Sequence, residues 1–64
     1  MSEVEVKWRH RRLERFHSDV DHEDADECVA LLRRRARELG RPVDQLTLRV
    51  WPDGKPGFRR EYRA

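Results

Sequence analysis

The chain has 64 residues and a formal net charge of +2, and 44% of its residues are charged. This length allows a single domain, and a domain of this size buries only about 60% of the surface that its unfolded chain exposes. Because such a core is thin, self-association would bury more apolar surface. No apolar run approaches the roughly 20 residues of a membrane-spanning helix, and one cysteine excludes an internal disulfide framework. We therefore expect a cytoplasmic protein without a membrane partner.

The first two predicted elements form a hairpin. Residues 4–10, VEVKWRH, alternate between apolar and charged side chains, which predicts a half-buried strand with Trp8 on its core face. Residues 12–18 are expected to return as a second strand. Their apolar residues Leu13 and Phe16 have opposite parity, so a regular strand carries only one of them inward. A β-bulge would bring both to the core.

The segment 23–39 is predicted to be an amphipathic helix, because its apolar residues recur at spacings of three and four. Acidic residues crowd its first turns and arginines its last, as the helix dipole favours. Asp21 or Asp24 is expected to cap its N-terminus, and Gly40 its C-terminus, before Pro42 prevents continuation. The expected buried stripe consists of Ala25, Cys28, Val29, Leu32, Ala36 and Leu39.

The C-terminal third is predicted to be a second hairpin. Residues 45–51 alternate with a period of two, the loop 52–57 is rich in proline and glycine, and residues 58–63 alternate again. The order is therefore strand, strand, helix, strand, strand. The sequence predicts an α+β fold, in which one helix packs on one face of a small, mostly antiparallel sheet of three or four strands. The other face of the sheet is expected to be open.

The stretch 17–28, HSDVDHEDADEC, holds six carboxylates and no lysine or arginine. Counted from Asp19, a calcium loop needs glycine at its sixth position and glutamate at its twelfth, where this chain has Asp24 and Ala30. The side chains that a zinc site would draw on lack the usual paired spacings. We therefore predict a helix cap, without metal or other cofactor. The zinc candidates rejected in this way are His17, Asp21, His22 and Cys28.

The charge of the chain is unevenly distributed. Residues 17–28 have a balance of −6, and the fifteen basic and seven acidic residues elsewhere have a balance of +8, which together give the net +2. We predict an electrically polarised domain, which would be steered toward a partner of opposite pattern.

Two groups of basic side chains are the candidate binding residues. Trp51 has the parity opposite to the core residues of its strand, so it is either an exposed interface anchor or a ring packed over the loop between Pro52 and Pro56. The candidate partner-binding residues are Trp51, Arg49, Arg9, Arg59 and Arg63. A secondary basic helix face consists of Arg33, Arg34, Arg37 and Arg41.

No pattern in the sequence indicates catalysis or a small-molecule substrate. The cysteine belongs to the buried stripe, His17 and Ser18 lack a third, orienting group, and there is no glycine-rich phosphate loop. We predict a small non-enzymatic accessory or regulatory protein that binds a protein partner or forms a homodimer. The alternative is a nucleic-acid-binding protein that uses an arginine-rich sheet face. Thirteen arginines against two lysines also fit a GC-rich bacterial or phage genome, so arginine content alone does not decide.

Overall fold

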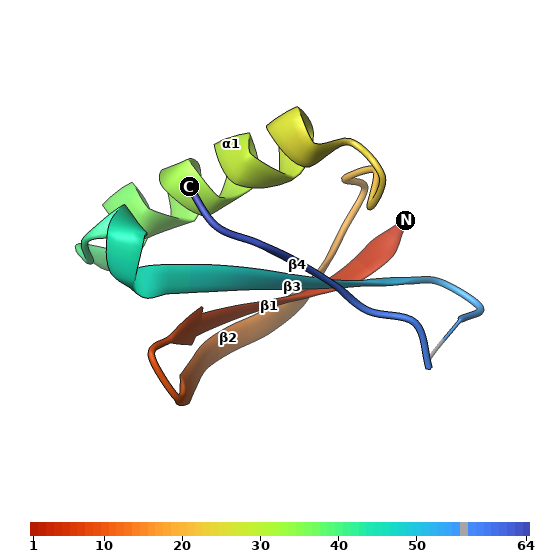
Figure 1. Cartoon of the computed structure of the whole chain (residues 1–64), viewed down its shortest axis with the longest axis horizontal. Coiled ribbons are helices and arrows are strands. Elements are labelled where there is room, and N and C mark those ends of the chain that lie inside the picture. The colour runs from red at the N-terminus through yellow and green to blue at the C-terminus, as the bar shows by residue number, and fades with distance from the viewer. Residues whose placement is uncertain (56) are drawn as a thin grey trace.

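A computed structural model describes residues 1–55 and 57–64 and has one antiparallel sheet with one helix on one of its faces (Figure 1). Helix α1 (Ala25–Leu39) and a short 3-10 helix, η1 (Val43–Gln45), lie between the two hairpins in the chain. The spatial order of the strands is β2-β1-β3-β4. The predicted α+β class and element order are confirmed. The strands are β1 (Ser2–Trp8), β2 (Arg11–Ser18), β3 (Leu46–Pro52) and β4 (Arg60–Tyr62).

The two central strands, β1 and β3, supply the sheet's part of the core. Their register places Val4 opposite Val50 and Val6 opposite Leu48, and all four side chains are fully buried. Each aliphatic side chain buried in this way contributes about 1.5–3 kcal/mol relative to an exposed position. The helix packs on this apolar face, with most of its contacts to β3 and β4. The buried residues of the helix are Cys28, Leu31, Leu32 and Ala36.

The ends of α1 follow capping chemistry. The Asp24 carboxylate accepts the backbone N–H of Glu27 at 3.1 Å, so Asp24 is the N-cap. Asp21 instead forms the turn before the helix, where its carboxylate accepts the N–H of Glu23 at 2.9 Å. Gly40 ends the helix with a left-handed φ of 66°. The predicted caps at both ends are therefore confirmed, with Asp24 chosen over Asp21.

The predicted buried stripe of the helix is wrong at three positions. Val29 is only half-buried and does not belong to the core cluster. Ala25 is exposed, because α1 begins at this residue and not at residue 23, so its first turn lies outside the packed part of the helix. Leu31 was left out of the stripe but is only 6% exposed. Leu31 lies on the side of α1 that faces β2, which widens the buried face beyond the row centred on Leu32.

The predicted second strand and its bulge are confirmed. The pairing of β1 with β2 shifts register after Val6, which leaves Leu13 as the extra residue of β2. As a result both Leu13 and Phe16 pack against the core cluster. The last strand is shorter than the predicted 58–63, and Phe58 before it is 42% exposed.

A test of the first hairpin uses its two-residue loop, in which Arg9 has a left-handed φ of 57° and His10 does not. Glycine adopts such a φ without strain, so it relieves strain at residue 9 and only adds flexibility at residue 10. We expect the free energy of unfolding of Arg9→Gly to exceed that of His10→Gly by about 1 kcal/mol. The midpoint of thermal unfolding of Arg9→Gly should therefore lie about 5 °C above that of His10→Gly. Thermal unfolding followed by circular dichroism measures the midpoints of both variants. Equal midpoints would contradict the left-handed conformation of Arg9.

Candidate interaction surfaces

Charged side chains cover the sheet face opposite the helix. Glu5, in the middle of β1, is only 6% exposed and lies beneath three guanidinium groups. Its carboxylate is 3.9 Å from Arg12, 3.8 Å from Arg15 and 3.7 Å from Arg49. Because these arginines come from β2 and β3, the carboxylate links three strands by charge. A carboxylate this deeply buried requires such compensation.

Trp51 lies on this face, as its parity predicts, but Arg15 covers it. The Arg15 guanidinium is 4.6 Å from the centre of the Trp51 ring, and its Nη2 donates to Glu3 Oε2 at 2.7 Å. This hydrogen bond lowers the pKa of Glu3 and raises that of Arg15. Trp51 is half-buried, so it is a covered ring rather than a free anchor. Of the loop residues expected to pack on it, Pro56 lies outside the described residues.

Two of the candidate arginines on this face are already paired with an acid. Arg49 Nε lies 3.0 Å from Glu61 Oε1, and Arg59 Nη2 lies 3.6 Å from the same oxygen. Arg49 Nε is buried, and its N–H is aligned with no acceptor in the described part of the chain, so the contact with Glu61 is an ion pair without a well-directed hydrogen bond. A partner that approaches this face would therefore compete with Glu61.

The charge cluster on the sheet face predicts a large effect of Glu5→Gln. The change leaves three guanidiniums over a neutral, buried side chain, and we expect a loss of about 2 kcal/mol in the free energy of unfolding. Glu3→Gln breaks a more exposed pair and is the matched control, with an expected loss below about 1 kcal/mol. Urea unfolding measures both. A Glu5→Gln loss no larger than that of Glu3→Gln would show that the buried carboxylate does not hold the strands together.

The remaining candidate arginines, apart from Arg34, gather at one end of the molecule. The β1–β2 hairpin, the C-terminus of α1 and the start of β3 meet there (Figure 1). The guanidinium of Arg41 is 4.2 Å, and that of Arg9 5.1 Å, from the centre of the Trp8 ring. Two hollows lie at this end, one lined by Arg33, Arg37 and Arg41 and the other by Arg9 and Arg63. We call this surface the basic end and define it as Arg9, Arg33, Arg37, Arg41 and Arg63.

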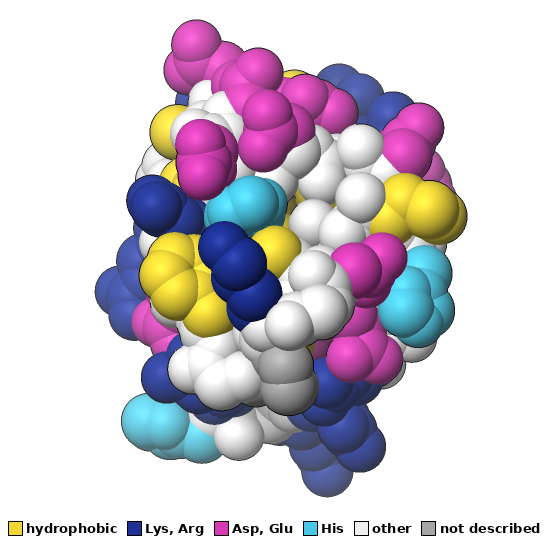
Figure 2. All heavy atoms as spheres, turned by 90° about the vertical axis from the view of Figure 1, so that its right-hand side faces the viewer, with side chains coloured by type: hydrophobic (Ala, Val, Ile, Leu, Met, Phe, Trp, Pro, Cys, Tyr) yellow, Lys and Arg dark blue, Asp and Glu magenta, His cyan; other side chains and the backbone are white. Residues whose placement is uncertain are grey.

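The acidic stretch lies at the opposite end. Figure 2 looks at that end and shows Asp and Glu side chains gathered around the start of α1. The register of β1 and β3 fixes this separation, because Trp8 pairs with Leu46 at the basic end whereas Ser2 pairs with Pro52 at the other. The polarity expected from residues 17–28 is therefore a feature of the folded chain.

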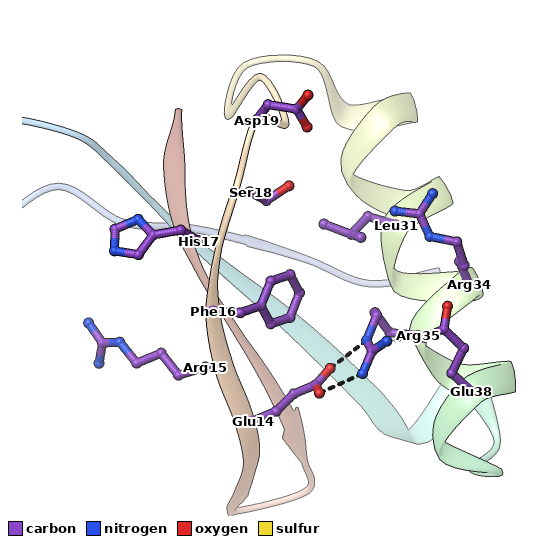
Figure 3. A pocket seen from close by; sticks show the side chains of 10 residues that line it. All are labelled: Glu14, Arg15, Phe16, His17, Ser18, Asp19, Leu31, Arg34, Arg35 and Glu38. Carbon is purple, nitrogen blue, oxygen red and sulfur yellow. Dashed lines mark hydrogen bonds and ion pairs between the residues drawn. The ribbon is translucent and has the colours of Figure 1, made fainter.

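A third surface is a hollow of about 530 Å³ between β2 and α1 (Figure 3). Phe16 and Glu14 point from β2 toward the helix, and Leu31 points toward them from α1. Arg35 spans the hollow, since its Nε and Nη2 each donate to the Glu14 carboxylate at 2.6 Å. Its guanidinium also lies 5.6 Å from the Phe16 ring and hydrogen-bonds Glu38. The bond to Glu14 raises the pKa of Arg35, which remains charged.

β2 forms the rim of this hollow and is an edge strand. β1 pairs with it on one side, and no other strand within residues 1–55 and 57–64 pairs with it on the other. An edge of this kind presents unpaired backbone N–H and C=O groups. Arg34 lies apart from the other three arginines of the predicted basic helix face, because it lines the hollow instead of the basic end. The sequence did not indicate this surface, because an edge is defined by strand order and not by composition.

The side chains with reactive chemistry are dispersed. Cys28 is fully buried, and its thiol donates to the backbone carbonyl of Asp21 at 3.4 Å. Burial raises the pKa of Cys28 to about 11, so the thiol stays protonated. His17 and Ser18 point to opposite sides of β2 (Figure 3). Within the described ranges no three His, Cys, Asp or Glu side chains lie close enough to hold a metal ion.

None of the described helices has the length and apolar character to span a membrane.

The raised pKa of Cys28 predicts a loss of stability at high pH. The folded state binds the thiol proton more tightly than the unfolded state, whose pKa is near 9.0. Its stabilising contribution is therefore complete below pH 9 and is lost as the pH rises toward 11. Urea unfolding at pH 8, 9 and 10 measures this loss. Cys28→Ala is the control, because Tyr62, whose pKa is also raised by burial, still titrates in it. Parallel declines in both proteins would contradict the prediction.

Comparisons with protein-family models, with curated proteins and with solved structures found no match for this chain.

Proposed function

We propose that the chain is a small non-enzymatic interaction module that binds an extended segment of a partner protein along β2. The observation that carries this proposal is the unpaired edge of β2 beside the open hollow. A partner strand would exchange backbone hydrogen bonds with β2 and extend the sheet by one strand. Its alternate side chains would enter the hollow, over Phe16 and Leu31.

Two exposed arginines near this edge favour a partner with acidic side chains, although Asp19 also lines the hollow. Arg11 lies at the start of β2 and Arg34 on the helix rim, both are exposed, and neither has a carboxylate within 4.0 Å in the described part of the chain. An acidic segment would neutralise both. A second copy of the chain is a less favourable occupant, because antiparallel pairing of two β2 strands brings the arginines of one close to those of the other.

The buried, protonated state of Cys28 supports a role in binding rather than in nucleophilic catalysis. A cytoplasmic accessory or regulatory protein of a bacterium or phage fits this role. The alternative, nucleic-acid binding through the sheet face, has less support, because Arg49 and Arg59 are paired with Glu61 and Arg15 covers Trp51.

The test compares capture from nuclease-treated lysate by the wild-type chain and by two charge variants. Arg11→Glu with Arg34→Glu reverses two charges beside the β2 edge. Arg33→Glu with Lys55→Glu makes the same change in charge away from it. We expect a protein captured by the wild type to be lost, by about tenfold or more, only with the first variant, because each charge reversal at an interface removes about 1 kcal/mol or more.

Equal capture by both variants would overturn the assignment to β2, and capture of nothing by the wild type would overturn the proposal. Analytical ultracentrifugation of the free chain tests whether a second copy of the chain, rather than a partner protein, occupies the β2 edge. A dimer that dissociates when Arg11 and Arg34 are reversed would replace the partner protein by a second copy of the chain. Circular dichroism confirms that each variant folds.

A further inference from the structure

The basic end is assembled from three parts of the chain. Arg9 comes from the first hairpin, Arg63 follows β4, and the helix supplies the other three arginines in its last two turns and just beyond. Arg9 and Arg63 line one hollow of about 320 Å³ together with Asp44. Arg33, Arg37 and Arg41 line the neighbouring hollow of about 530 Å³. The fold therefore joins residues from the two basic groups that the sequence suggested separately.

The guanidiniums of the basic end differ from those of the sheet face in their pairing. Over the described residues, none of the five has a carboxylate within 4.0 Å, although Asp44 lies in the same hollow as Arg9. All five arginine side chains are exposed to solvent. Five cations that form no ion pair with a carboxylate of the chain attract anions strongly.

Two of these cations are held in place by the Trp8 ring. Trp8 Nε1 donates to Gln45 Oε1 at 2.9 Å, which fixes the orientation of the indole. Arg9 and Arg41 both stack on this indole. A cation held over an aromatic face loses less side-chain freedom when it binds a ligand. Because its ring is already occupied by arginines, Trp8 is not offered to a nucleotide base. The surface is therefore built to contact phosphate groups and not bases.

We propose that the basic end binds the phosphodiester backbone of a nucleic acid without reading its sequence. A nucleic acid presents regularly spaced phosphates, and several guanidiniums at one end of a small domain can contact them together. The acidic opposite end, around the start of α1, would orient the domain so that the basic end approaches first. This site is separate from the β2 edge and goes beyond the proposed protein-binding role.

A phosphate-bearing membrane surface is the less favoured ligand, because proteins that bind at such a surface also insert apolar side chains. Among the described residues, the large apolar side chains that are exposed are Met1 and Phe58. Met1 precedes Ser2, which pairs with Pro52 at the far end of β1 and β3 from the basic end. Phe58 lies in the loop that follows Pro52. Neither would face a membrane bound at the basic end.

The test measures binding of the whole chain to a fluorescent single-stranded oligonucleotide and to its duplex by anisotropy. If four arginines contact phosphates, raising the salt from about 50 mM to about 200 mM lowers the affinity for the duplex about 100-fold. Arg33→Gln with Arg37→Gln removes two charges and leaves the Trp8 stack intact. We expect this variant to bind about tenfold or more weakly at low salt and to lower the slope of log K against log salt by about 2.

The matched control, Lys55→Gln with Arg60→Gln, removes the same charge away from the basic end and should bind as the wild type does. Equal weakening of binding in the control and test variants would show that the basic end is not the binding site. Absence of binding to either oligonucleotide at low salt would show that nucleic acid is not the ligand. Binding to anionic phosphatidylserine vesicles but not to oligonucleotides would make a membrane the ligand and also contradict the proposal. Failure here leaves the β2 proposal standing, because neither Arg33 nor Arg37 borders β2.

Discussion

A single helix of 15 residues has to cover a four-stranded sheet, and the rest of the structure depends on this constraint. Because one helix covers one face, the other face of the sheet is left without a second layer. The helix packs over β3 and β4, so β2 extends beyond the helix. On the uncovered face, guanidiniums around Glu5 take the place of a layer of apolar side chains. Beside β2, the pairing of Arg35 with Glu14 holds helix and sheet together across a hollow that apolar side chains do not fill.

The positions of the acids decide which arginines are available to a partner. Three glutamates, Glu3, Glu5 and Glu61, lie on the sheet face and pair with the arginines there. The acids of residues 17–28 lie at the far end of the domain, where they cap α1 and form the turn before it. They therefore leave the arginines of the basic end uncompensated. The polarity of the chain and the availability of its arginines have this same cause.

The fold could be predicted well because its periodicities are local. The alternation of residues 4–10 and the helix cap at Asp24 each depend on neighbouring residues, and so does the bulge that the parities of Leu13 and Phe16 require. The surfaces could not be predicted, because they depend on strand order. Parity places Arg49 on the open face, but only the β2-β1-β3-β4 order reveals that Glu5 lies beside it.

We propose two separate binding surfaces for the domain, the β2 edge for a protein strand and the basic end for phosphates. The central claim is that a partner pairs with β2, and amide hydrogen exchange by NMR tests it most directly. In the free chain, amides of residues 14–18 that point away from β1 should exchange rapidly. With the captured partner bound, these amides should gain about tenfold or more protection, because they become hydrogen-bonded. Protection that appears elsewhere and leaves β2 unchanged would contradict the account.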